Sequence, residues 1–359
     1  MNDWLTSVDE PAVLVTVAIV EGSGPREPGA RMLVTRGGQQ DTIGGGHLEL
    51  CAVDLARAML DDPGTGPARL ERYALGPTLG QCCGGVVHLA FEVVDAALHD
   101  VLAALRGQGH GHGYGRGRED SWRASAIDGA PAALLCDGAG RVVAGHGDPA
   151  GIASALQRVI GQGRTGNAPT TSVVRDADGR RWLLDACLAP RAHLLLFGAG
   201  HVGAAIVRTL GELPCTVTWI DEREDMFPAC VPANVTVEAT DTPEALVARA
   251  PAGASYLVLT HSHALDQRLS EAILARDQVG WFGLIGSSTK RVQFERRLAA
   301  RGIAQERIAA MVCPIGLPGI TSKLPAAIAA SVCAQLLMVW EAQQQAQPRS
   351  KPGIVPAVH

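Results

Sequence analysis

The stretch "AHLLLFGAGHVGAAIVRTLGELPCTVTWIDERE" runs from Ala192 to Glu224 and decides the fold of the second half of the chain. An apolar run is followed by a glycine turn, an amphipathic run and a second apolar run, which predicts a strand, a helix and a strand. Gly198, Gly200 and Gly203 form the pattern GxGxxG directly after the first predicted strand. Asp221 stands at the end of the second one.

Similar patterns continue outward from this stretch. Further predicted strands at "VTVEAT", "SYLVLTHSH" and "VGWFGLIGS" alternate with helical patterns, which is typical of a parallel, doubly wound sheet. In such a Rossmann-like fold the glycines let a pyrophosphate approach the helix N-terminus, and the acid, here Asp221, accepts from a ribose hydroxyl. We therefore expect a nucleotide or dinucleotide at this site. A Rossmann domain that has lost nucleotide binding is the alternative.

Two histidines, His261 and His263, follow the apolar run "SYLVL" at the predicted carboxyl edge of the sheet. A strand through "THSH" would put both on one face, where they and Asp266 could contact a ligand or hold a metal ion. No fourth metal ligand is evident, so a polar contact to the ligand or backbone is the favoured interpretation.

The first half of the chain carries two further loops with anion-binding chemistry. "GSGPREPGARMLV" holds Arg26 and Arg31 on a turn stiffened by prolines, and "TIGGGHLE" places Gly44, Gly45 and Gly46 before a predicted helix. Successive glycines can form a nest of backbone N–H groups that binds a phosphate or a dioxo-anion. The alternative is a tight turn closed by an ion pair between Arg31 and Glu49.

Adjacent cysteines, Cys82 and Cys83, lie between Gln81 and two glycines. A disulfide between neighbours has unfavourable geometry, and zinc would need two more soft ligands when only His88 is near. A catalytic thiol would need a base and an oxyanion site, and neither can be identified. A thiolate that contacts a soft metal or carries sulfur needs only exposure, flexibility and a nearby anion site. Burial as small apolar side chains is the alternative.

The composition limits the class of protein. The chain has 359 residues, 47% hydrophobic and 19% charged, with 42 glycines and a net charge of −5, so nothing predicts nucleic acid or a membrane as partner. Nine cysteines without a disulfide framework, and an acidic N-terminus unlike a signal peptide, predict a cytoplasmic protein. The apolar run 324–340 is interpreted as a buried helix.

The predicted organisation has two domains. We expect a β-rich α+β domain over 1–190, with a flexible glycine-rich loop at 106–120, and a Rossmann-like domain over 191–342. The polar tail 343–359 is expected to be disordered.

Taken together, the motifs resemble a known family. They are "GSGPREPGARMLV", "TIGGGHLE", "LGPTLGQCCGGVVHLAFE", "LLLFGAGHVGAAIVRTL", "DEREDMFP", "THSHALDQRL", "GLIGSSTKRVQFERRL" and "CPIGLPGITSKLPAAIAASV". In this order they are similar to the XdhC/CoxI family, accessory proteins of xanthine dehydrogenase and related molybdenum hydroxylases. The resemblance covers most of the chain outside the glycine-rich segment and the tail.

The resemblance implies a chaperone that binds the molybdenum cofactor, a molybdenum–molybdopterin with a terminal phosphate. It implies that a cysteine desulfurase supplies the sulfido ligand, that the xanthine dehydrogenase large subunit receives the cofactor, and that the chain forms a homodimer. The family's double-cysteine motif falls on Gln81, Cys82 and Cys83. We expect one of the cysteines to approach molybdenum or to relay sulfur, and Arg26 and Arg31 to neutralise the phosphate.

Two other functions stay open at this point. One is an NAD(P)-dependent oxidoreductase that uses Gly198–Gly203 and Asp221, with His261 or His263 as acid or base. The other is a dimeric scaffold that bridges desulfurase and dehydrogenase without binding the pterin. A maturation factor is favoured over an enzyme because no site for hydride transfer is recognisable.

Overall fold

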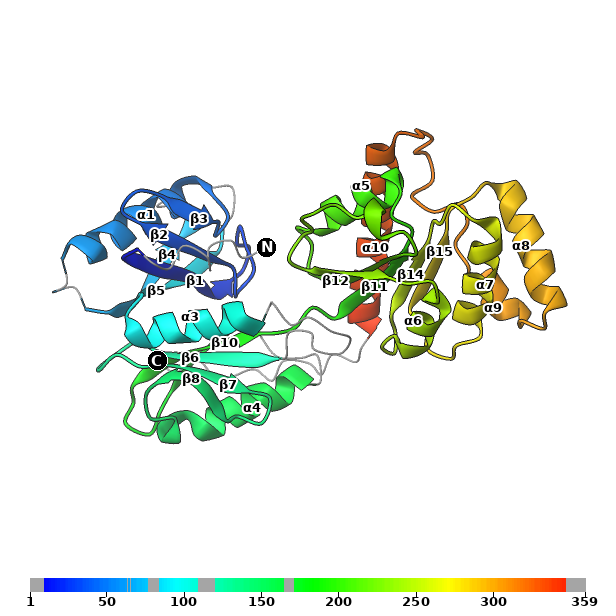
Figure 1. Ribbon diagram of the computed structural model, residues 1–359. Coiled ribbons are helices and arrows are strands. Elements are labelled where there is room, and N and C mark those ends of the chain that lie inside the picture. The colour runs from blue at the N-terminus through cyan, green and yellow to red at the C-terminus, as the bar shows by residue number, and fades with distance from the viewer. Residues whose placement is uncertain are drawn as a thin grey trace. The chain divides into compact units, whose positions relative to one another are not determined.

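A computed structural model describes residues 10–62, 64, 66–76, 84–108, 120–164 and 171–346 (Figure 1). These residues form two compact units, which we call the N-terminal unit, residues 10–189, and the C-terminal unit, residues 190–346. Each unit has its own hydrophobic cores and is described by itself.

The N-terminal unit contains the same arrangement twice. Its two five-stranded antiparallel sheets have the strand orders β3-β2-β1-β5-β4 and β8-β7-β6-β10-β9, which become identical when five is added to each number of the first. We call residues 12–93 the first repeat and residues 121–187 the second repeat. The first comprises β1 (Ala12–Glu21), β2 (Arg31–Thr35), β3 (Gln39–Asp41), α1 (Gly46–Asp61), β4 (Ala68–Ala74) and β5 (Val86–Val93). The second comprises β6 (Ser121–Ala126), β7 (Ala133–Asp137), β8 (Val142–His146), η3 (Ala150–Ile152), α4 (Ala153–Arg164), β9 (Thr171–Arg175) and β10 (Arg181–Cys187).

Alternation of side chains along the strands builds the layers of this unit. Val13 and Val15 of β1 pack against α1 on the outer face of the first sheet, whereas Leu14 points inward toward the second sheet. On the second sheet, Trp122 packs outward with Leu156 of α4. The connecting helix α3 (Ala96–Gln108) packs against both sheets in the space between them (Figure 1).

Four charged side chains meet where the two sheets face each other, three of them buried and that of Arg31 17% exposed. The first repeat supplies Arg31 and Glu92, and the second supplies Arg123 and Asp185. Arg123 Nη1 lies 2.7 Å from Glu92 Oε2, Arg31 Nη2 lies 2.7 Å from Asp185 Oδ1, and Arg123 Nη2 lies 3.2 Å from Asp185 Oδ2. Burial opposes the charge on both arginines, but the carboxylates outweigh it and raise the pKa of both guanidinium groups. We call this set the buried charge quartet.

The C-terminal unit confirms the predicted doubly wound fold. All neighbours in the order β13-β12-β11-β14-β15 are parallel. Helices α5 and α10 cover one face of the sheet, and α6, α7, α8 and α9 cover the other. The strands are β11 (Ala192–Phe197), β12 (Cys215–Asp221), β13 (Val235–Ala239), β14 (Ser255–Val258) and β15 (Trp281–Leu284). The helices are α5 (His201–Leu210), η4 (Glu224–Met226), α6 (Pro243–Arg249), α7 (His263–Leu274), α8 (Ser288–Ala300), α9 (Gln305–Ala309) and α10 (Pro325–Ala346).

Helix α10 extends four residues past residue 342, where a disordered tail was expected to begin. By length and composition it is apolar enough to cross a membrane, and one face of it, with Val332, Leu336 and Trp340, is buried against α5 and the sheet. The predicted glycine-rich loop 106–120 also needs correction, because α3 continues through Gln108; residues 109–119 of that prediction lie outside the described residues.

Candidate functional site

The glycine loop after β11 has the local geometry that the sequence pattern predicts. Gly198 has φ +121°, and a Cβ there would meet the carbonyl oxygen of Leu259. A Cβ on Gly203 would meet the carbonyl oxygen of Gly198, so this glycine lets α5 pack closely on the loop. Around Gly200, a Cβ would meet nothing within 4 Å. The backbone at Gly200 is therefore open to the approach of a ligand.

Asp221 does not lie as the ribose-binding prediction requires. Its side chain is 3% exposed and accepts from the backbone N–H of Ala199 at 2.7 Å and from the guanidinium of Arg223 at 2.9 and 3.0 Å. It also accepts from the backbone N–H of Arg223. Burial works against ionisation, but these hydrogen bonds prevail and lower the pKa of Asp221. Asp221 therefore fixes the glycine loop and Arg223, and its acceptor capacity is already used.

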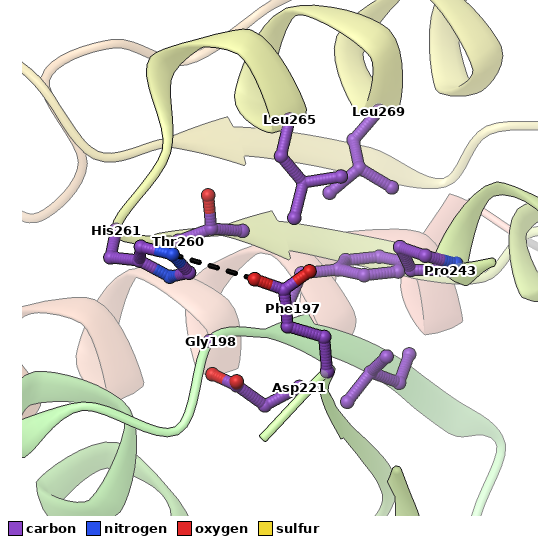
Figure 2. A pocket seen from close by; sticks show the side chains of 10 residues that line it. Phe197, Gly198, Asp221, Pro243, Thr260, His261, Leu265 and Leu269 are labelled. Carbon is purple, nitrogen blue, oxygen red and sulfur yellow. Dashed lines mark ion pairs between the residues drawn. The ribbon is translucent and has the colours of Figure 1, made fainter. Parts of the chain in front are cut away.

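A pocket lies at the carboxyl edge of the sheet, where β11, β12 and β14 end beside α7 (Figure 2). His261 and Glu222 both line this pocket and form an ion pair, with His261 Nε2 and Glu222 Oε1 3.4 Å apart (dashed line in Figure 2). β11 and β14 are neighbours in the sheet although β12 and β13 come between them in sequence, so the pocket lies at a topological switch point, where open α/β sheets bind ligands. The pocket is lined by Phe197, Gly198, Ile220, Asp221, Glu222, Pro243, Thr260, His261, Leu265 and Leu269.

The predicted pairing of His261 with His263 on one strand face is wrong. β14 ends at Val258, and Ser262 caps α7 by accepting from the backbone N–H of Leu265, so His263 is the first helical residue and points to solvent. Asp266 is fully buried, with its carboxylate 2.7 Å from both Thr260 Oγ1 and Lys290 Nζ. No cluster of metal ligands occurs among the described residues.

In the first repeat, two of the predicted loops come together. Arg26 Nη1 donates to the carbonyl oxygen of Thr42 at 3.3 Å, and a Cβ on Gly44 would lie 2.6 Å from Cβ of Pro25. Gly44, Gly45 and Gly46 all have positive φ, a conformation that glycine adopts without steric cost. The Arg26 side chain is 36% exposed and pairs with the neighbouring Glu27. Arg26 therefore offers a cation to solvent beside the glycine turn.

The nest is closed by the chain's own carboxylate. Glu49 Oε2 accepts from the backbone N–H of Ile43 at 3.0 Å and of Gly45 at 3.1 Å, and from Thr42 Oγ1 at 2.5 Å. Partial burial opposes ionisation of Glu49, but these donors lower its pKa. The alternative Arg31–Glu49 ion pair is not formed, because Arg31 belongs to the buried charge quartet and pairs with Asp185. Arg31 is for the same reason not placed to neutralise a ligand phosphate.

Gln81, Cys82 and Cys83 lie outside the described residues. The residues on either side of that segment are well defined: Leu75 donates to the carbonyl oxygen of Gly85 at 3.0 Å, and Gly85 donates to that of Ser23 at 3.2 Å. A Cβ on Gly85 would also lie 2.5 Å from the carbonyl oxygen of Glu21. The flanks of the cysteine segment are thus joined to the loop that carries Arg26.

Fold and sites together define a class of protein with a duplicated antiparallel α/β unit followed by a Rossmann-type unit. A family model described as the XdhC Rossmann domain matches residues 194–336, and one described as the XdhC and CoxI family matches residues 5–74. The chain belongs to the XdhC/CoxI family, as its motifs predict.

Two known proteins are similar to the chain. The uncharacterized protein YqeB of Escherichia coli K12 is 29% identical over 178 residues, which are 49% of this chain and 32% of YqeB, so the chain matches about a third of that relative's length. The crystal structure of a Bacillus halodurans protein described as a xanthine dehydrogenase is similar over 98% of this chain and 96% of that one, with a TM-score of 0.68 and 19% identity. At this identity the likeness shows a shared fold.

Proposed function

We propose that this protein is an accessory factor of xanthine dehydrogenase or a related molybdenum hydroxylase, and that it binds the molybdenum cofactor for sulfuration and delivery. Membership in the XdhC/CoxI family supports the accessory role. In this proposal the cofactor is a cargo, a cysteine desulfurase supplies its sulfido ligand, and the large subunit of the dehydrogenase receives it. The protein acts in the cytoplasm as a homodimer.

The observation that carries this proposal is the convergence of loops in the first repeat. The Arg26 loop, the glycine turn at Gly44 and the flanks of the cysteine segment at Gly85 all meet at one end of the first sheet. An anionic cargo with a phosphate at one end and a soft metal–sulfur centre at the other requires a cation and soft donors close together.

The residues fit such a cargo with one revision of the expected roles. Arg26 is partly exposed and binds the phosphate after release from Glu27, while Arg31 serves the buried charge quartet instead. Glu49 occupies the glycine nest, so a phosphate enters the nest only when that carboxylate withdraws. Cys82 and Cys83 supply thiolates for contact with molybdenum or for holding sulfur; protein donors of this kind suit soft metal centres.

The test is the amount of pterin bound to the full-length chain. Protein incubated anaerobically with the cofactor is separated from the free form and denatured, and the released pterin is oxidised and measured by its fluorescence. We expect Arg26→Gln to retain at most about a tenth of the wild-type amount, because a charge-assisted hydrogen bond contributes about 1.5–3 kcal/mol. Arg36→Gln is the matched control, since Arg36 forms an exposed pair with Asp61 on the same repeat.

A second measurement addresses the cysteines. Cys82→Ala/Cys83→Ala protein is mixed with cofactor, desulfurase and apo-xanthine dehydrogenase, and dehydrogenase activity is followed. We expect little activation by this variant and full activation by the Arg36→Gln control. Wild-type loading by Arg26→Gln together with wild-type activation by the double cysteine variant would contradict the proposed site, and absence of bound pterin on the wild-type chain would contradict the function.

A further inference from the structure

We propose that the pocket of the C-terminal unit binds the adenosine end of a nucleotide, that Glu222 rather than Asp221 accepts from the ribose hydroxyls, and that the pocket rejects a 2′-phosphate. This site lies in the other unit from the proposed cargo site and does not depend on it. The glycine pattern alone predicts only a nucleotide of some kind. The pocket adds the adenosine class of ligand and a residue that determines specificity.

The lining of the pocket suits a base and its ribose. Its wall is apolar over five side chains, those of Phe197, Ile220, Pro243, Leu265 and Leu269. The polar side chains that line it, Asp221, Glu222, Thr260 and His261, come from the carboxyl ends of β12 and β14. A base against the apolar wall and a ribose at the polar side chains match this lining.

The hydrogen bonds decide which carboxylate meets the ribose. Four N–H donors already contact the two oxygens of Asp221, and its side chain is 3% exposed. The Glu222 side chain is 42% exposed, lines the same pocket and has an ion pair only with His261, at 3.4 Å, among the described residues. A carboxylate with free acceptor positions can take both hydroxyls of a 2′,3′-diol. Glu222 therefore takes the role that sequence spacing gives to Asp221.

The charge around Glu222 gives the site its selectivity. Residues 221–225 read Asp-Glu-Arg-Glu-Asp, and the single cation, Arg223, is paired with Asp221 through two side-chain hydrogen bonds. Nothing in this segment is left to balance the charge of Glu222. A 2′-phosphate beside Glu222 would bring like charges together, and the neighbouring guanidinium of Arg223 is engaged by Asp221, whereas a 2′-hydroxyl donates to the carboxylate.

The experiment compares nucleotides that differ only at the 2′ position. Binding of NAD⁺ and NADP⁺, and of ADP and 2′-deoxy-ADP, to the full-length chain is measured by isothermal titration calorimetry. We expect NAD⁺ to bind at least about 10-fold more tightly than NADP⁺, and ADP about 10- to 100-fold more tightly than 2′-deoxy-ADP, as a hydrogen bond to a charged group implies. Glu222→Gln should reduce both ratios to about 3-fold or less.

Glu224→Gln is the matched control. Glu224 is exposed, lies two residues away and does not line the pocket, so its removal changes the net charge equally but should keep both ratios. Equal affinity for NAD⁺ and NADP⁺, no binding of any of the four nucleotides, or wild-type ratios in Glu222→Gln would each overturn the proposal. None of these results bears on pterin loading by the N-terminal unit.

Discussion

The two repeats of the N-terminal unit share their strand order but differ in the connections between strands. The first repeat joins β1 to β2 through residues 22–30 and β4 to β5 through residues 75–85, whereas the second uses residues 127–132 and 176–180. The candidate loops at Arg26 and Gly44, and the cysteine segment, all lie on the first repeat. One copy of the sheet therefore carries the candidate site residues on its longer connections, and the other copy provides the surface against which the first sheet packs.

The buried charge quartet contains residues from both repeats and joins them by ion pairs. Each repeat contributes one arginine and one carboxylate, and two of the three ion pairs cross from one repeat to the other. Replacement of Arg123 would remove the ion-pair partner of buried Glu92 and leave Asp185 paired with Arg31 alone, and an unpaired buried charge costs more than the loss of the pair itself.

The largest effect is therefore expected for Arg123→Met, which leaves the buried Glu92 carboxylate without its ion-pair partner. We expect the free energy of unfolding to fall by about 3–5 kcal/mol. Urea denaturation followed by circular dichroism measures the change. Arg141→Met removes a pair with Asp137 in which the arginine side chain is 80% exposed, and should cost at most about 1 kcal/mol. Similar losses for the two variants would show that the quartet does not hold the repeats together.

An intermediate loss of stability is expected for a glycine substitution in the β4–β5 connection of the first repeat, and a smaller one for the equivalent β9–β10 connection of the second. In Gly85→Ala the new Cβ meets the backbone oxygens of Ser23 and Glu21, which cannot move independently, so we expect a loss of about 2–3 kcal/mol. In Gly179→Ala of the second repeat the Cβ meets nothing within 4 Å, and only its φ of +81° costs about 1 kcal/mol. Thermal unfolding of both variants makes the comparison. Equal destabilisation would mean that the first connection is not pinned to the Arg26 loop.

The smallest effect concerns the glycine turn of the first repeat. Glu49→Gln removes the charge that accepts from Ile43 and Gly45, and because the carboxylate is only partly buried we expect a loss of about 1 kcal/mol at pH 7. The pKa of Glu49 is lowered on folding from its usual 4.5, so its contribution is present above about pH 4.5 and is lost as the pH falls through the lowered value.

The difference in unfolding free energy between wild type and Glu49→Gln should therefore shrink below pH 4.5. Asp148→Asn serves as the control in the corresponding connection of the second repeat. Its side-chain oxygen accepts from one backbone N–H, of Ala150, an acceptor that asparagine keeps, so a change within about 0.5 kcal/mol is expected. A gap that stays constant down to pH 3 would contradict the role of the Glu49 charge.

Local patterns predicted the Rossmann unit well, because strand, glycine turn and helix follow one another within 33 residues. Gly198 and Gly203 have the backbone environments that the motif implies. The role of Asp221 could not be predicted in the same way. The motif gives the position of the acid, but it does not show that the guanidinium of Arg223 donates to both oxygens of this carboxylate. For His263 a signal was present: Ser262 precedes an amphipathic run, which is the pattern of a helix N-cap.

The spacing of residues along the sequence could not predict the ion-pair partner of Arg31. Glu49 is 18 residues away and suggested a closed turn, whereas the actual partner, Asp185, is 154 residues away on the other repeat. The duplication itself was hidden because the connections differ in length, so no fixed sequence period marks it. Helices α3 and α4 were likewise not predicted, and both lie between stretches with strand-like patterns.

Helix α10 has a consequence for the order in which the protein forms during synthesis. Its buried face completes the core over β11, β12 and β14, and Trp340 Nε1 donates to Ser255 Oγ at 3.0 Å. Translation delivers this helix more than 100 residues after the strand it covers first, whereas every element of the N-terminal unit has left the peptidyl-transferase centre by then. The N-terminal unit can thus be complete on the ribosome while the C-terminal sheet, covered on this face by α5 alone, still exposes the apolar residues that α10 later buries.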